Sequence, residues 1–168
     1  SLIGNCFEVC NLSIQSDMEI ESLNKQFRLL QKAVHPDRFV NATDSDKKQS
    51  MIKSTEINEA YQTLKDPISR ASHIISLHEN LKEETLPPEF LMQQMEWEEE
   101  LEDSNDAQQL DNLAHQIDEE KNAILNLLTV QLDEKKDYQS ALVLVGKLKF
   151  ITSLYKKIKQ KTFSMDPT

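Results

Sequence analysis

The sequence is poor in glycine and has no long apolar run. Only two of its 168 residues are glycine, which leaves little material for the glycine-rich loops that bind phosphates and dinucleotides. No apolar stretch approaches the roughly 18–20 residues of a membrane span, and the first residues lack the basic and apolar regions of a signal peptide. We therefore expect a soluble, intracellular, all-α protein without a membrane partner.

Cysteine is also scarce. Cys6 and Cys10 are too few for a disulfide framework, and their spacing has no second pair that would complete a zinc site. We predict that both are reduced, partly buried thiols, and that the protein holds no metal ion and no cofactor.

Positive charge is outnumbered and unevenly placed. Lys and Arg total 19 against 29 Asp and Glu, giving a net charge of −10, which disfavours a nucleic-acid partner. Residues 81–134 carry 2 basic and 16 acidic side chains, whereas residues 135–168 carry 8 basic and 2 acidic. This segregation predicts that the two segments lie side by side, that one faces a partner, or both.

Apolar residues recur at helical spacing in the first half of the chain. Asp17 is a candidate N-cap for a helix that should stop before Pro36, because the residue before a proline is steered out of the α region. A polar loop is expected over residues 36–46, a second helix over 46–64, and a third from Asp66-Pro67 onward. The predicted inner positions are Ile20, Leu23, Phe27, Leu30 and Val34 on the first helix and Met51, Ser54, Ile57, Tyr61 and Leu64 on the second.

The helical pattern lapses at residues 80–88, where Pro87-Pro88 predicts a linker. Three further helices follow: a short acidic one over 90–103, a long one and a final one. The long helix carries Leu110, Leu113, Ile117, Ile124, Leu128 and Leu132, and the final helix carries Tyr138, Leu142, Val145, Leu148, Ile151, Tyr155 and Ile158. These near-heptad stripes predict a three-helix bundle.

No constellation of catalytic residues occurs in the sequence. Zinc-protease, nucleophile-elbow and phosphate-loop motifs are absent. The carboxylates between Glu96 and Glu102 are best explained as a solvated helix face, and His73, His78 and His115 are isolated. We predict that the protein is not an enzyme.

His35-Pro36-Asp37 lies between two expected helices and follows three cations. Lys25, Arg28 and Lys32 are spaced three and four residues apart, which places them on one solvent-facing edge of a helix. Such an edge would steer the helix toward an acidic surface. Taken alone, the tripeptide is explained equally well as a helix stop and turn.

The order of motifs across residues 1–75 resembles the J-domain of DnaJ-type co-chaperones. The His-Pro-Asp loop is followed by Ile57-Asn58-Glu59-Ala60-Tyr61 and by the segment 64–71 that begins Leu64-Lys65-Asp66-Pro67. The resemblance implies an antiparallel helix pair that presents the loop to a heat-shock ATPase chaperone and stimulates ATP hydrolysis there. The chaperone-binding residues that it implies are Lys25, Arg28, Lys32, His35, Pro36, Asp37 and Arg38.

The second half is similar to the HscB family of iron–sulfur-assembly J-proteins. Residues 90–101 and 146–150 carry this likeness, in a chain without a Gly/Phe-rich segment or zinc-binding cysteines. The resemblance implies that the C-terminal bundle binds an IscU-type iron–sulfur scaffold and delivers it to an HscA-type chaperone. The scaffold-binding residues that it implies are Leu91, Met92, Met95, Glu96, Glu99, Asp103 and Phe150.

Spacing supports this scaffold patch independently. Leu91, Met92, Met95, Glu99 and Asp103 fall on one side of a helix, so an apolar centre grades into an acidic end. The alternative is that the three apolar side chains fill the bundle core. Trp97 lies on another side and is expected to pack in the core or between domains.

Some residues depart from the family pattern. Val34 precedes the histidine where many J-domains have an aromatic residue, Arg38 stands where Lys is common, and Met95 stands where bacterial members often have Leu. Cys6 and Cys10 cannot reproduce the paired C-x-x-C motifs of some eukaryotic relatives. We expect a bacterial-type, cytoplasmic member; a eukaryotic one would belong in the mitochondrial matrix.

The expected protein is an L-shaped monomer with a J-domain over residues 1–79, a linker over 80–88 and a bundle over 89–168. Three other functions stay open on the residues alone. They are a general J-protein that presents unfolded clients to a DnaK-type chaperone, an iron–sulfur or metal carrier that uses Cys6, Cys10 and nearby histidines, and a helical enzyme with carboxylate chemistry.

Overall fold

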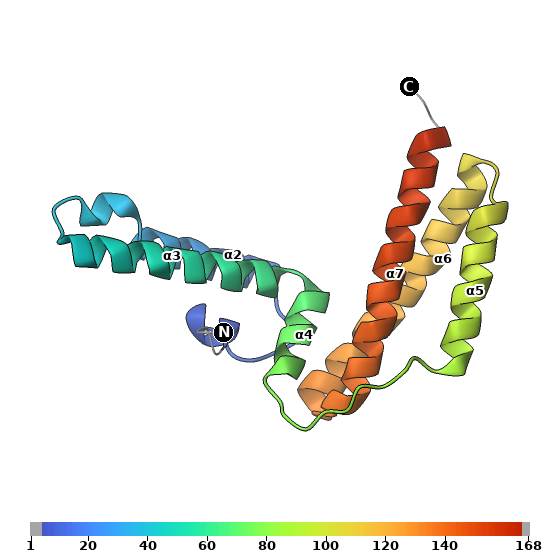
Figure 1. Ribbon diagram of the computed structural model, residues 1–168, viewed down its shortest axis with the longest axis horizontal. Coiled ribbons are helices and arrows are strands. Elements are labelled where there is room, and N and C mark those ends of the chain that lie inside the picture. The colour runs from blue at the N-terminus through green and yellow to red at the C-terminus, as the bar shows by residue number, and fades with distance from the viewer. Residues whose placement is uncertain (1–4, 166–168) are drawn as a thin grey trace. The chain divides into compact units, whose positions relative to one another are not determined.

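The computed structural model describes residues 5–165, and the outer ends of the two predicted domains, residues 1–4 and 166–168, lie outside them. The chain divides into two helical units, residues 1–79 and residues 80–168. Between residues 5 and 165 the secondary structure is helical, with no strand (Figure 1). No helix in this range is long and apolar enough to cross a membrane.

The first unit is built on two helices, α2 (Ile20–Ala33) and α3 (Asp44–Lys65), which run side by side in opposite directions (Figure 1). Its elements are α1 (Cys6–Val9), α2 (Ile20–Ala33), the 3-10 turn η1 (Pro36–Phe39), α3 (Asp44–Lys65) and α4 (Pro67–Ser76). The core contains Leu23 of α2, Ile57 and Leu64 of α3 and Phe7 of α1, all of them buried. This is the predicted helix pair, with α1 packed on α3.

Several helix ends follow from local capping. Asp66 accepts a hydrogen bond from the backbone N–H of Ser69 at 2.9 Å, and Pro67 opens α4, as predicted. The prediction for Asp17 was wrong, because α2 begins at Ile20 and its N-cap is Glu19. The predicted loop over 36–46 is also shorter, since η1 lies within it and Thr43 caps α3 two residues earlier than expected.

Two predicted inner positions lie outside the core. Ile20 is 42% exposed and Met51 is 69% exposed. Ile20 is the first residue of α2, where the helix has only begun to pack. Met51 lies on a part of α3 that faces η1 rather than α2, and there it borders an open groove with Val40.

The second unit is a three-helix bundle. It consists of α5 (Pro88–Asp103), α6 (Ala107–Thr129), the π-helical turn η2 (Val130–Glu134) and α7 (Tyr138–Met165), with α6 antiparallel to its two neighbours (Figure 1). The predicted α6 stripe is buried throughout. On α7, Val145, Leu148, Ile151 and Ile158 are buried as predicted, whereas Tyr138, Leu142 and Tyr155 of the predicted stripe are only half-buried. Ala141 and Leu154, which the stripe did not include, are buried as well.

The start of α5 differs from the predicted linker. Pro88 is the first residue of the helix, because the N–H that proline lacks has no partner in the first helical turn. At the other end of α5, the Lys161 ammonium of α7 donates to the carbonyl oxygens of Leu101 at 2.5 Å and Glu102 at 3.2 Å. The basic segment therefore lies beside the acidic one within the bundle, and a lysine closes the last turn of α5.

Candidate functional site

The first candidate surface is the basic edge of α2. Lys25, Arg28 and Lys32 are all exposed or half-buried, and they lie one helical turn apart. Among the residues that the structure describes, no carboxylate forms an ion pair with any of the three. Their charges are therefore available to a partner with an acidic surface.

The His-Pro-Asp loop continues this edge. The Nδ1 atom of His35 accepts a hydrogen bond from the backbone N–H of Asp37 at 3.2 Å, which makes His35 the N-cap of η1. In the neutral ring this places the proton on Nε2, where it can be donated to a partner. The side chains of His35 and Asp37 are 59% and 89% exposed. The loop thus combines a locally fixed backbone with exposed functional groups, and Arg38, also exposed, extends it.

Sequence reasoning missed the contact that joins this loop to α3. The Ser50 hydroxyl donates to the carbonyl oxygen of Val34 at 2.8 Å, across sixteen residues of sequence. Ser50 was not among the predicted inner positions, because the apolar pattern selected its neighbour Met51. A serine one turn before Ser54, on the same side of the helix, was the available signal.

The second candidate surface is the outer side of α5. Leu91, Met92 and Met95 are 44%, 64% and 70% exposed, and Glu99 and Asp103 are exposed as well, as is Glu96. The three apolar side chains therefore do not fill the bundle core. That place belongs to Phe90 and Trp97, which are 7% and 3% exposed. We call the seven implied residues, Phe150 included, the α5 patch.

Phe150 reaches α5 through an aromatic cluster. Its ring lies edge-on to that of Phe90, with centroids 6.0 Å apart, and Phe90 contacts Trp97 in the same way at 6.1 Å. The ammonium of Lys147 lies 5.4 Å from the centre of the Phe90 ring. Phe150 is half-buried, so the patch gains a fixed aromatic edge from α7.

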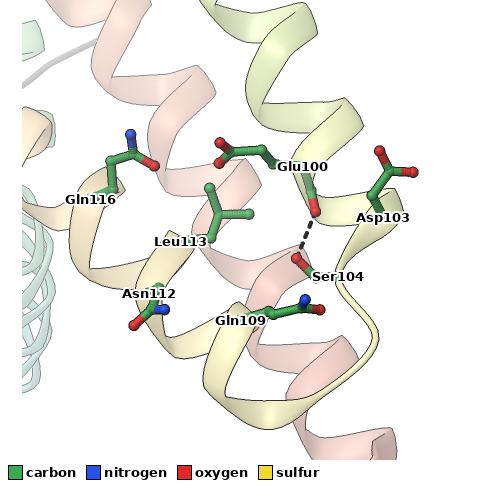
Figure 2. A pocket seen from close by; sticks show the side chains of 7 residues that line it. All are labelled: Glu100, Asp103, Ser104, Gln109, Asn112, Leu113 and Gln116. Carbon is green, nitrogen blue, oxygen red and sulfur yellow. Dashed lines mark hydrogen bonds between the residues drawn. The ribbon is translucent and has the colours of Figure 1, made fainter.

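The acidic end of the α5 patch opens into a polar groove. Figure 2 shows the groove where α5 ends and α6 begins, with the Glu100 and Asp103 carboxylates on the α5 side and the amides of Gln109 and Asn112 on α6. The hydroxyl of buried Ser104 donates to the carbonyl oxygen of Glu100 at 2.6 Å and shapes the turn. Sequence spacing predicted the acidic end but not this groove, because the amides come from another helix.

The cysteines have no such exposure. Both are free and buried, and burial raises the pKa of Cys10 to about 11 and raises the pKa of Cys6 as well. Both thiols are therefore protonated at neutral pH. A cysteine binds a metal ion as the thiolate, which is the deprotonated form. Residues 5–165 contain no group of three or more His, Cys, Asp or Glu side chains placed to hold a metal ion.

Comparison with known proteins gives the same division of the chain. Residues 7–73 match the family model described as the DnaJ domain, and residues 86–159 match the model described as the HSCB C-terminal oligomerisation domain. The chain is 40% identical over 164 residues to the co-chaperone protein HscB homolog of Shewanella sp. (strain W3-18-1), covering 92% of this chain and 94% of that protein. It is 38% identical to the homolog from Photobacterium profundum, with coverage of 93% and 95%.

Solved structures share the fold. Chaperone HscB from Vibrio cholerae superposes with a TM-score of 0.82 at 34% identity, covering 95% of this chain and 98% of that one. The human co-chaperone protein HscB superposes with a TM-score of 0.87 at 23% identity, with coverage of 95% and 83%, and this likeness concerns the fold alone. Together these matches confirm an all-α fold with a J-domain and a C-terminal helical domain.

Proposed function

Because this chain belongs to the HscB family of J-domain co-chaperones, we propose that it binds an IscU-type iron–sulfur scaffold and presents it to an HscA-type ATPase chaperone. The family implies an Hsp70-type partner for the J-domain. The observation that carries the proposal of scaffold binding is the exposed α5 patch. Its side chains Met92 and Met95 are exposed and do not contribute to the bundle core. Stimulated hydrolysis and scaffold delivery would promote cluster transfer to iron–sulfur proteins.

At the J-domain, the proposed mechanism combines steering with a defined contact. The cations of α2 raise the rate at which an acidic chaperone surface is encountered. His35, Pro36, Asp37 and Arg38 then contact the chaperone, with the His35 Nε2 proton as a donor. The groups that hydrolyse ATP belong to the chaperone, so the co-chaperone needs no catalytic residues of its own.

At the bundle, the α5 patch fits a folded partner with an apolar surface and a basic rim. Methionine side chains adapt to the shape of a partner, and Leu91 and Phe150 extend the apolar area. Glu96, Glu99 and Asp103 lie at the acidic side and disfavour partners without complementary basic groups. One chain that holds both partners raises the effective concentration of the scaffold at the chaperone. In this way it stimulates ATP hydrolysis by the chaperone although it carries out no chemical step itself.

The test is the steady-state ATPase rate of an HscA-type chaperone, with this protein and an IscU-type scaffold added separately and together. We expect synergistic stimulation that a His35→Gln variant loses. Stimulation without any effect of the scaffold would indicate a general J-protein for unfolded clients of a DnaK-type chaperone. No stimulation under any condition would reduce His35-Pro36-Asp37 to a helix stop.

We also propose that the protein acts as a monomer in the bacterial cytoplasm. The apolar stripes of α6 and α7 are satisfied inside the bundle, which supports the monomer, and the bacterial relatives support the compartment. Sedimentation velocity tests the first point. A dimer at micromolar concentration would contradict it and agree with the description of the matching C-terminal family model.

A further inference from the structure

The backbone of α2 ends with a carbonyl group that the helix cannot use. In a continuing helix the Val34 carbonyl would accept the N–H of Arg38. That N–H instead donates to the carbonyl oxygen of His35 at 3.0 Å, because Pro36 turns the chain into η1. The Val34 carbonyl is the last one before the His-Pro-Asp loop, and the Ser50 hydroxyl is its partner at 2.8 Å.

The contact between Ser50 and Val34 is partly buried, and Val34 itself is half-buried. Ser50 is 7% exposed, in a part of α3 where most side chains are open to water. Val34, Phe39 and Ser50 line both of the grooves that border this part of α3. Because the Ser50 side chain is buried, water competes less for this hydroxyl than for an exposed one, so it holds its partner more firmly.

The other hydrogen bonds of the loop are local. His35 Nδ1 accepts from the N–H of Asp37, and the N–H of Ala42 donates to the carbonyl oxygen of Phe39 at 3.0 Å. Such bonds shape the turn without fixing its place on the molecule. Within the described part of the chain, the bond between Ser50 and Val34 is the only hydrogen bond that joins residues 34–42 to the body of α3.

We propose that Ser50 is a positioning residue for the His-Pro-Asp loop. Through the Val34 carbonyl it sets where His35 and Asp37 stand relative to α3, while it touches no partner itself. This inference rests on the proposed function, because it assumes that the loop contacts the ATPase chaperone. It predicts that removing the Ser50 hydroxyl affects the stimulated rate more than it affects folding or binding.

The experiment compares Ser50→Ala with a matched control, Ser54→Ala. Ser54 lies one turn later on α3, and its hydroxyl also reaches the α2 segment, at Gln31 Oε1 over 3.3 Å, but does not contact the loop. For each variant, the ATPase rate of an HscA-type chaperone is measured against co-chaperone concentration. Thermal unfolding of both variants gives their stability.

We expect Ser50→Ala to lower the maximal stimulation about five-fold, the factor that corresponds to one neutral hydrogen bond. The half-maximal concentration should stay unchanged, because Lys25, Arg28 and Lys32 still steer the encounter. Ser54→Ala should retain wild-type stimulation with a similar change in Tm, and Ser50→Thr, which keeps the hydroxyl, should restore most of the maximal rate.

Three outcomes would overturn the proposal: equal stimulation by Ser50→Ala and Ser54→Ala, no rescue by Ser50→Thr in a folded protein, or an effect confined to the half-maximal concentration. His35→Gln separates this failure from that of the proposed function. If His35→Gln stimulates as well as the wild type, the loop has no role in the chaperone contact. If it abolishes stimulation while Ser50→Ala has no effect, only the positioning role is wrong.

Discussion

At the scale of single residues, side-chain hydrogen bonds decide how distant segments meet. The backbone N–H of Cys6 donates to the Nε2 atom of His73 at 2.9 Å, and the His73 ring stacks on Phe7 with centroids 6.0 Å apart. These contacts tie α1 to α4. The hydrogen bond from Cys6 requires an imidazole that is unprotonated at Nε2.

This requirement predicts a pH dependence of stability. Burial lowers the pKa of His73 below its ordinary value of 6.5, so the unfolded chain takes up the proton first. The contribution of neutral His73 to the free energy of unfolding is therefore complete above pH 6.5. It is lost as the pH falls from there through the folded-state pKa of His73. Urea unfolding between about pH 7.5 and about pH 5 measures it. A His73→Gln variant, which does not titrate, should lose less stability over this range; equal losses would contradict the role of His73.

Residue-scale details could be predicted only where the partner is near in sequence. Asp66 lies three residues from the N–H that it caps, so local pattern was enough to find it. Ser50 and His73 bond to groups sixteen and sixty-seven residues away, and no local pattern specifies such pairs. The wrong cap at Asp17 shows that capping patterns do not place every helix start, since α2 begins at Ile20 without any side-chain cap.

At the scale of elements, α5 shows how one helix divides its sides. Periodicity placed Leu91, Met92 and Met95 together but did not decide whether they face the core, since Phe90 and Trp97 form a second apolar side. The larger aromatic side chains occupy the core because they bury more apolar area in contact with α7. Which side a helix buries depends on its neighbours, and these are not encoded in the helix itself.

This division of α5 predicts that substitutions on its two sides affect different quantities. On the exposed side they should affect partner binding, and on the buried side they should affect stability. A Met92→Ala, Met95→Ala double variant should weaken scaffold binding at least about ten-fold, because the centre of an interface carries most of its energy. Its Tm should not change, since both side chains are exposed. Trp97→Ala should instead lower the free energy of unfolding by about 3–5 kcal/mol.

Isothermal titration with an IscU-type scaffold and thermal unfolding separate these effects. Leu127→Ala is the matched control, because Leu127 is a 53% exposed apolar residue on another helix of the same bundle. The Leu127→Ala variant should change neither the affinity for the scaffold nor the Tm. Scaffold binding that is as weak in the control as in the double variant would remove the α5 patch from the proposal.

At the scale of the whole molecule, the two units carry different charge. The segment that forms α5 and α6 is strongly acidic, whereas the outer side of α2 presents three cations without ion-pair partners in the described chain. Prolines and a lapse in periodicity lie close to the boundary between the two units. The arrangement of surfaces within each unit was not predictable, since it depends on packing between helices.

This layout predicts that chaperone stimulation depends on salt. A Lys25→Glu, Arg28→Glu double variant should raise the half-maximal concentration for ATPase stimulation about ten-fold at low ionic strength, and the difference should shrink as salt screens the charges. A Lys82→Glu variant changes an exposed lysine outside the J-domain and serves as control. A shift of the same size in the control would attribute the effect to net charge rather than to the α2 edge.

The contact between α1 and the later helices also bears on the order of folding. Most contacts in both units join helices that follow one another in sequence, an arrangement associated with fast folding. The α1 segment departs from this order, because it packs on α3, its Phe7 ring stacks on His73 of α4, and the Cys6 N–H bonds to the same histidine. During synthesis these residues leave the ribosome early, yet α3 follows only after α2 and η1, and His73 emerges sixty-seven residues after Cys6. The apolar α1 segment therefore has no native partner until α3 has been made, and its contacts are complete only with α4.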